Sequence, residues 1–382
     1  MPDIISSFIT AFMLSFMLLP LVIKVFKWKN IVDTPGGRKI HKGQIPSMGG
    51  IAIFFGFLMA VVMWRPIEVF GNFQYFFASL VIIFILGLRD DLIPLKAYHK
   101  PLGQLFAAFM VVYLNDIRLN SLYGLFGIVH VPDLLAYAIS IFTIIVITNS
   151  FNLIDGLDGL ASTLAVITLT AYGAWFYLTG HSLLSLMIFS LSGSIIGFIN
   201  FNWSPAKIFM GDTGSLLIGF FLASISLYFI DVNYNLPGSY PLKFEAGIGT
   251  AVCVMMMPIF DTTRIMISRK IRGKSPFSPD KTHIHHLVMR LGLNHANTAL
   301  IMGGINVVFI IMAVALKNYG EWIVIPAAIA LAFGFSFVLD YFLKVKFPKK
   351  KSLRAQISDM SKKGKDEDSS DFSDDDAEDE RA

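Results

Sequence analysis

The sequence contains little cysteine and little charge, and each shortage excludes a class of protein. Its single cysteine, Cys253, lies in an apolar run, which excludes a disulfide framework and a zinc site built on thiolates. Only 15% of the 382 residues are charged, whereas soluble domains contain about 25%. The first seven residues include Asp3 but no basic residue. This argues against a cleaved signal peptide, and we expect residues 4–26 to be the first membrane span.

Long apolar segments dominate the chain. Hydrophobic residues make up 55% of it, and the mean hydropathy is +0.64. A membrane-spanning helix needs about 20 apolar residues, within a range of roughly 17–25. The sequence therefore predicts an all-α, polytopic membrane protein with eleven spans. They are residues 4–26, 48–65, 71–88, 101–117, 131–150, 159–178, 182–201, 213–231, 245–267, 296–316 and 321–344.

The basic residues between these spans predict an orientation. Counted over alternate loops, sixteen Lys and Arg fall on one side and four on the other; the four are Arg65, Arg118, Lys243 and Lys317. Cytoplasmic loops carry the excess of basic residues. We therefore expect the N-terminus outside, the C-terminus in the cytoplasm, and all the polar motifs described below on the cytoplasmic face.

The end of the chain has a different composition. Ten of the 27 acidic residues lie between Asp366 and Glu380, so residues 1–365 carry 30 Lys and Arg against 17 Asp and Glu. We expect residues 351–382 to be a disordered acidic tail. No repeat of fixed period is visible, and residues 1–350 should form one transmembrane catalytic domain. Its basic balance suits anionic lipid headgroups and phosphate substrates.

Two acidic motifs close or join predicted spans. Asp90-Asp91 ends the third span, where carboxylates oppose the helix dipole unless a cation or proton is shared. A solvated turn paired with Arg89 explains it equally well. Residues 149–159 join the fifth and sixth spans and contain two amides and two acids. One acid would suffice to cap a helix, so the second favours a Mg²⁺ or phosphate site.

A third acidic motif opens the eighth span. In residues 209–215, Asp212 lies among glycines and hydroxyl side chains, a composition that suits a helix cap or a phosphate site. As an isolated pattern it is weak. A second acidic loop expected on the same face of the membrane strengthens the functional interpretation.

Histidines and basic residues follow the ninth span. His283, His285 and His286 lie near five basic residues between positions 269 and 281. Zinc is a rival interpretation, but no thiol or second histidine cluster matches it. The segment is better interpreted as an anion-binding loop for a diphosphate or a lipid phosphate. Asp261 and Arg264, spaced i and i+3, are more simply explained as an internal ion pair.

Together these motifs resemble the polyprenyl-phosphate N-acetylhexosamine-1-phosphate transferase superfamily, also called glycosyltransferase family 4. The matching segments are Pro46-Ser47-Met48-Gly49-Gly50, Asp90-Asp91, residues 149–159, Asn202 with residues 209–215, and residues 273–286. Residues 275–286 resemble the branch that transfers GlcNAc-1-phosphate from UDP-GlcNAc to undecaprenyl phosphate and releases UMP. That branch begins O-antigen, enterobacterial common antigen or teichoic acid synthesis. The MurNAc-pentapeptide transferases are the second choice, because Ile284 interrupts their three consecutive histidines and Ser47 replaces their usual Thr.

The resemblance implies a multi-pass protein of the bacterial inner membrane with its active site on the cytoplasmic face. It implies Mg²⁺, with Mn²⁺ as an alternative, and UDP-N-acetylhexosamine and undecaprenyl phosphate as partners. We allow for a homodimer and expect no nucleic acid partner. A secondary transporter is the alternative from another class, although transporter sites lie near the membrane midplane. The predicted catalytic residues are Asp90, Asp91, Asp155, Asp158, Arg269, His283, His285 and His286; the substrate contacts are Lys42, Ser47, Asn149 and Asn202; the metal ligands are Asp212, Asn152 and Asp155.

Overall fold

The computed structural model describes residues 1–31, 45–65, 71, 73–96, 98–122, 125–128, 131–275 and 282–347. These parts of the chain are helical and contain no β-strand. The chain divides into two compact units, Met1–Phe335 and Ser336–Ala382. The described part of the second unit is the end of one long helix. The predicted acidic tail and Lys42 lie outside the described residues.

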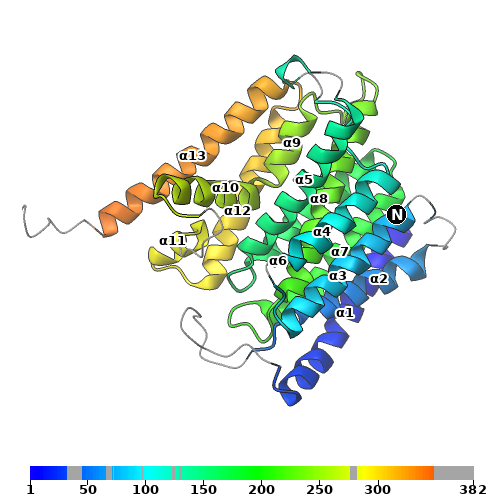
Figure 1. Ribbon diagram of the computed structural model, residues 1–382, viewed down its shortest axis with the longest axis vertical. Coiled ribbons are helices and arrows are strands. Elements are labelled where there is room, and N and C mark those ends of the chain that lie inside the picture. The colour runs from blue at the N-terminus through cyan, green and yellow to red at the C-terminus, as the bar shows by residue number, and fades with distance from the viewer. Residues whose placement is uncertain are drawn as a thin grey trace, which may run out of the picture. The chain divides into compact units, whose positions relative to one another are not determined.

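A helix occupies each of the eleven predicted ranges (Figure 1). The helices are α1 (Pro2–Trp28), α2 (Gly49–Trp64), α3 (Gln74–Leu92), α4 (His99–Phe109) continued by the π-helical turn η2 (Met110–Leu114), α5 (Asp133–Ile154), α6 (Leu160–Leu178), α7 (Ser182–Asn202), α8 (Gly211–Asn235), α9 (Gly247–Val254), α10 (Met256–Ile271), α11 (Ile284–Arg290), α12 (His295–Ala315) and α13 (Glu321–Lys346). A short 3₁₀ turn, η3 (Leu125–Gly127), lies between η2 and α5.

By length and composition, seven of the described helices are suited to cross a membrane. They are α1, α5, α6, α7, α8, α12 and α13, and α9 with α10 makes an eighth if the pair is one span. Helix α2 is apolar but has only 16 residues, and α3 carries three charged residues near its end. The protein is therefore a multi-pass membrane protein, and the count of eleven crossings stays a prediction.

Helix α8 is the centre of the first unit. It is buried along almost its whole length and packs against α2, α3, α5, α6 and α9. Small residues make this close packing possible, as they do in membrane helices generally. A Cβ atom on Gly50 of α2 would collide with the backbone of Gly214, so these two helices touch through their main chains. The start of α8 is consequently enclosed by neighbouring helix ends.

The predicted ninth span is broken. Helices α9 and α10 meet at an angle of 82°, and Figure 1 shows α10 running across the direction of its neighbours. Pro258 has no N–H to donate to the carbonyl of Val254, four residues earlier. Asn306 of α12 takes over: its Nδ2 donates to the Val254 carbonyl at 3.2 Å, and its Oδ1 accepts from the Met257 N–H at 3.4 Å. The hydrogen bonds of Asn306 therefore stabilise the break between α9 and α10.

A carboxylate holds the other end of α9. Glu321, at the start of α13, accepts hydrogen bonds from the N–H groups of Ile248 and Gly249, both at 2.7 Å. These donors lack partners inside their own helix. Glu321 is buried despite its charge, and its two bonds explain why it is tolerated there. Sequence analysis did not single out this residue.

Replacing Asn306 by Leu should destabilise the protein. The change removes the side-chain acceptor of the buried Met257 N–H and leaves the Val254 carbonyl with the Thr168 hydroxyl, at 3.3 Å; we expect a loss of about 1–3 kcal/mol in unfolding free energy. We expect a lower Tm in detergent for Asn306→Leu. The control is Asn200→Leu in α7, where the exposed side chain donates only to the Ile196 carbonyl of its own helix. Equal Tm values for the two variants would contradict this account of the break.

Candidate active site

Two motifs from distant parts of the sequence pair through their backbones. The Phe209 N–H donates to the Pro46 carbonyl at 2.8 Å, and the Gly49 N–H donates to the Phe209 carbonyl at 2.9 Å. Gly211 then begins α8 with a positive φ of 73°, and a Cβ there would collide with the Ser47 carbonyl oxygen. Only glycine combines this backbone conformation with so close an approach. The pairing brings Ser47 to the start of α8.

Asp91 caps α8. One carboxylate oxygen accepts from the Asp212 N–H at 2.8 Å, and the other accepts from the Thr213 N–H at 2.8 Å and the Thr213 hydroxyl at 2.6 Å. The positive end of the α8 dipole thus stabilises a carboxylate that would be unfavourable at the end of α3 alone. The resemblance implied that Asp91 is a catalytic residue. In the structure its oxygens are engaged with α8, and a direct contact with substrate stays a prediction.

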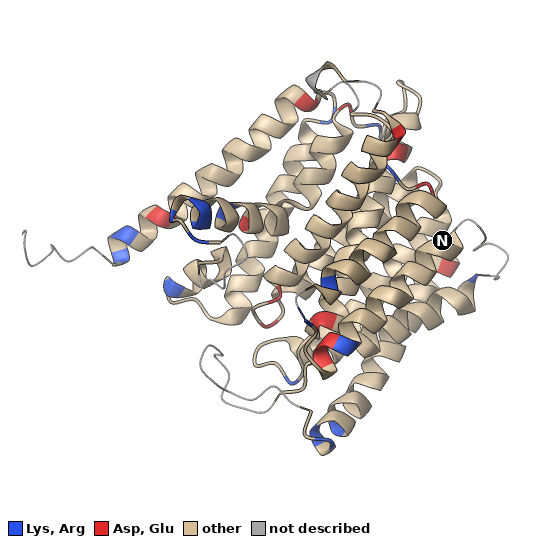
Figure 2. Ribbon diagram, viewed as in Figure 1, with Lys and Arg blue, Asp and Glu red and all other residues tan. Residues whose placement is uncertain are grey.

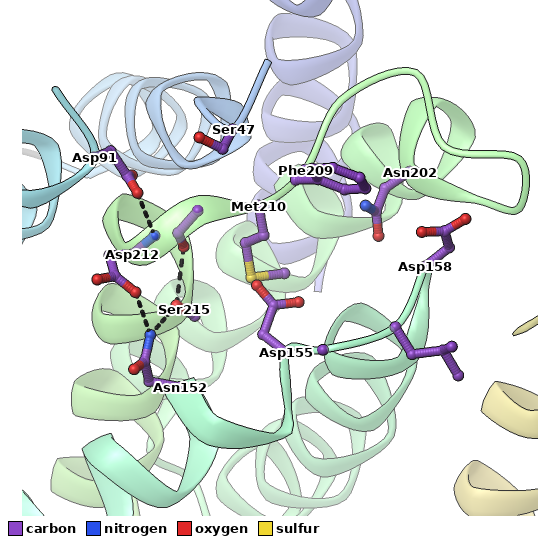
Figure 3. Close-up of a pocket in the computed structure, with 13 residues that line it drawn as sticks. Ser47, Asp91, Asn152, Asp155, Asp158, Asn202, Phe209, Met210, Asp212 and Ser215 are labelled. Atoms are coloured by element: carbon purple, nitrogen blue, oxygen red, sulfur yellow. Dashed lines mark hydrogen bonds between the residues drawn. The ribbon is translucent and has the colours of Figure 1, made fainter. Parts of the chain in front are cut away.

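The side chain of Asp212 on α8 contacts α5 and α4, and Figure 3 shows its contact with Asn152 of α5. Its two oxygens meet the Asn152 amide and the Lys100 ammonium, both at 2.6 Å. Lys100 also lies 3.3 Å from a carboxylate oxygen of Asp90. The structure therefore brings together Asp90, Asn152 and Asp212 as the predicted site requires. Sequence analysis counted Lys100 only as a loop charge and missed its place between two acids.

Asp155 adds further negative charge. It lies where α5 ends, and Figure 3 shows its side chain in the cavity beside Met210. Burial raises its pKa to about 7, and the nearby charges of Asp212, Asp91 and Asp158 act in the same direction. A cation close to this carboxylate would relieve the repulsion.

The cavity has a volume of about 400 Å³. Its lining is dominated by helix ends and by oxygen-bearing side chains. Carboxylate and amide oxygens are the ligands that Mg²⁺ uses, so the residues present fit a hard divalent cation. The lining residues are Ser47, Asp91, Asn152, Asp155, Gly156, Leu157, Asp158, Asn202, Phe209, Met210, Gly211, Asp212 and Ser215.

Three other predicted site residues form hydrogen bonds that connect helices and loops around the site. The Asn202 amide accepts from the Gly159 N–H at 3.0 Å and donates to the Ile208 carbonyl at 3.0 Å. Asp158 accepts from the Ala206 N–H at 3.3 Å and lies 3.1 Å from Nδ1 of His295. Asn149 forms an amide pair with Gln104, with its Nδ2 donating at 2.7 Å. Their predicted catalytic or substrate roles stay predictions beside these structural ones.

The histidine motif is not the loop that the sequence suggested. Residues 284–290 form the short helix α11, and His283 is its N-cap. Asp261 accepts from the Ile284 N–H at 2.7 Å and lies 2.7 Å from Nδ1 of His283. The expected ion pair of Asp261 with Arg264 is present at 3.7 Å, but it is only part of what Asp261 does. Arg264 also donates to the Thr282 carbonyl.

His285 faces the α5–α6 loop. A Cβ atom on Gly156 would lie 3.0 Å from its Nε2, which places the histidine motif at the edge of the cavity. The ring is 1% exposed, and burial lowers its pKa to about 3, with the neighbouring His286 adding to the effect. His285 is therefore neutral and cannot attract a phosphate by charge. Arg269 is buried in the last turn of α10 and is not among the residues that line the cavity.

Asp261, His283 and His285 also form a group that could hold a metal ion. One ligand atom from each lies within 4.8 Å of the others, and all three side chains are buried. Sequence analysis set zinc aside because it found no matching thiol or second histidine cluster in the chain. Asp261, 22 residues earlier in the chain, is the residue it missed. The signal was available, because an acid inside an apolar span calls for a partner.

Fold and site together define a multi-pass membrane protein in which helix ends enclose an acidic, cation-compatible cavity. Comparison with known proteins makes this more specific. Residues 73–230 match the model of glycosyl transferase family 4. The chain is 35% identical over 326 residues to a probable undecaprenyl-phosphate N-acetylglucosaminyl 1-phosphate transferase of Bacillus subtilis strain 168, covering 84% of this chain and 87% of that protein.

Two enterobacterial proteins with the name undecaprenyl-phosphate alpha-N-acetylglucosaminyl 1-phosphate transferase are also similar. The relative from Yersinia pestis is 32% identical over 74% of this chain and 75% of its own length. The relative from Escherichia coli strain K12 is 31% identical over 74% of this chain and 76% of its own length. The chain belongs to glycosyl transferase family 4 and is a transferase.

The cap on α8 gives a stability prediction. In Asp91→Asn, the amide can accept with one atom only, so one donor of the first turn of α8 loses its partner. We expect unfolding free energy to fall by about 1–2 kcal/mol, measured as a lower Tm in detergent. Asp90→Asn, at the neighbouring position, is the matched control, because the Asp90 carboxylate accepts from the backbone N–H of Leu95 and caps no helix. A larger destabilisation by Asp90→Asn than by Asp91→Asn would contradict the assignment.

Proposed function

We propose that the protein transfers GlcNAc-1-phosphate from UDP-GlcNAc to undecaprenyl phosphate, forming undecaprenyl-diphosphate-GlcNAc and releasing UMP. The observation that carries the proposal is the arrangement around Asp212, whose oxygens contact Asn152 and Lys100 while Lys100 also reaches Asp90. It lies in a chain whose relatives, similar over most of their length, carry the name of this activity. The reaction would begin the synthesis of a cell-surface polysaccharide.

Asp212, Asn152 and Asp155 would hold Mg²⁺, with Mn²⁺ as the alternative. Support comes from the donor set, which is made of carboxylate and amide oxygens, and from the crowding of negative charge around Asp155. When bound, the ion would neutralise charge on the diphosphate. Lys100 supplies the positive charge that the protein itself contributes between Asp90 and Asp212.

The remaining residues position the reactants. A phosphate oxygen of the lipid attacks the β-phosphorus of the nucleotide sugar, the bond from that phosphorus to the bridging oxygen breaks, and the oxygen leaves on UMP. Phosphoryl transfer depends mainly on positioning and charge stabilisation. A phosphomonoester has a second pKa of about 6, so the nucleophile is already largely ionised at neutral pH. Asp90 therefore serves to position Lys100 and the lipid phosphate, while the histidine motif, residues 283–286, at the edge of the cavity faces the leaving group.

The proposed setting is the bacterial inner membrane, with eleven crossings, the N-terminus outside and the cavity on the cytoplasmic face. The count of basic residues supports this orientation. In Figure 2 the charged positions gather near helix ends, and a compact group of acidic positions with an adjacent basic one lies in the lower centre of the view. The expected position of all the acidic motifs at one face of the membrane argues against a transporter, whose site would lie near the midplane.

An assay for UMP release tests the proposal. Purified protein with undecaprenyl phosphate, Mg²⁺ and UDP-GlcNAc should release UMP, and a panel of other UDP-N-acetylhexosamines and UDP-MurNAc-pentapeptide should be used less well. Asp212→Asn should lower kcat by about 100-fold or more, because removing one charged group from such a site costs at least about 3 kcal/mol. Asp231→Asn, near the other end of the same helix, is the control. No UMP from any sugar nucleotide would sink the proposal.

The pH dependence separates a base from a positioning residue. If Asp90 only positions other groups, Asp90→Asn should stay slower than the unchanged protein by a constant factor from about pH 6.5 to pH 9, because the lipid phosphate ionises with a pKa of about 6 regardless. The measurement is the initial rate of UMP release across that range. Recovery of the variant at high pH would instead identify Asp90 as a general base.

A further inference from the structure

We propose that Asp261 positions the histidine motif, residues 283–286, for the reaction. This inference rests on the proposed function, in which that motif faces the leaving group. Asp261 lies on α10, is not among the residues that line the cavity, and is 1% exposed. It is a positioning residue, because it acts through His283 and the start of α11.

One carboxylate controls both the backbone and the ring of the motif. Oδ1 of Asp261 accepts from the Ile284 N–H at 2.7 Å, in the first turn of α11, where helix donors lack partners in their own helix. Oδ2 lies 2.7 Å from Nδ1 of His283. Arg264, one turn further along α10, donates to the Thr282 carbonyl and adds a third connection. The segment 282–284 is thus attached to α10 at three points.

The hydrogen bond also decides which nitrogen of His283 faces a ligand. A carboxylate can only accept, so Nδ1 must carry the hydrogen. Nε2 is then left for a contact with substrate or water, and its role is fixed by the partner of the other nitrogen. His285 stacks on His283, with ring centroids 5.4 Å apart and planes 17° apart, and it reaches Gly156 at the cavity. Asp261 therefore sets the orientation of rings that border the site.

The broken span explains why Asp261 is available for this task. Asp261 lies five residues after Met256, in the part of the chain that turns by 82° from α9. Pro258 and Asn306 maintain that turn through the Val254 carbonyl. A straight helix would continue along the axis of α9 and carry Asp261 and Arg264 away from residues 282–284. The position of the histidine motif therefore depends on the break between α9 and α10.

The distances favour a hydrogen-bonded pair over a shared metal ion. Two atoms bound at about 2.0–2.1 Å to a tetrahedral zinc ion lie about 3.4 Å apart. The 2.7 Å between Nδ1 of His283 and Oδ2 of Asp261 is instead the length of a hydrogen bond. Metal binding by Asp261, His283 and His285 is the alternative that the experiment must distinguish from the hydrogen-bonded pair.

The test compares Asp261→Asn in the full-length protein with a matched control. An amide cannot accept at both positions, so either the His283 tautomer or the cap on Ile284 is lost. We expect kcat for UMP release to fall by about 10- to 100-fold, as for other residues that orient a functional histidine, with KM for UDP-GlcNAc changed less than about threefold. Glu321→Gln removes an equally buried capping carboxylate at the other side of the break, and its kcat should stay near that of the unchanged protein. Equal losses in both variants would overturn the proposal.

A double-mutant cycle with His283→Ala gives a readout that does not need activity. If Asp261 acts through His283, the Tm of the double variant should match that of the more damaging single variant. The kcat of the double variant should likewise match that of the slower single variant. Additive effects would overturn the proposal. So would stoichiometric zinc in the purified protein that disappears in His283→Ala. A protein that releases no UMP but shows the coupled Tm values would count against the proposed function and in favour of this pair.

Discussion

The structure depends on the contact between Asp91 and the first turn of α8. A carboxylate at the end of α3 is unfavourable by itself, and the free N–H groups at the start of a buried helix are equally unfavourable by themselves. Each satisfies the other through three hydrogen bonds. The contact joins segments 121 residues apart and places the side chain of Asp212 where it meets Asn152 and Lys100. Without it, the acidic motifs would be separate helix ends.

The same solution recurs at two other helices. Glu321 holds the start of α9, and Asp261 holds the start of α11, each by accepting from backbone N–H groups. In an apolar surrounding, an unpaired backbone group costs several kcal/mol, so an acid that pairs with it is stabilising although it is buried. Acids in this protein therefore have two kinds of role. Some support helices, and others, above all Asp212 and Asp155, present oxygens to the cavity.

Local patterns in the sequence predicted much of this structure. Apolar runs located a helix in each of the eleven ranges, and the acidic motifs named the residues found around the cavity. Four features were missed, one of them the buried carboxylate of Glu321 at the start of α9. Pro258 could have indicated the break in the ninth span, whereas the Lys100–Asp212 contact spans 112 positions and leaves no local trace. Asp261 was interpreted through its near neighbour Arg264, because its stronger partner, His283, is 22 positions away.

What the sequence by itself determined is the set of membrane-compatible helices and the residue types at their ends, because hydrophobicity, helix propensity and proline act over a few neighbouring residues. Only the tertiary structure decided which acid supports a helix and which faces the cavity. Asp90 and Asp91 are adjacent in the chain, yet Asp91 binds α8 while Asp90 binds Lys100. Successive residues of a helix point about 100° apart, so their partners are set by the packing of other helices, which no local pattern records.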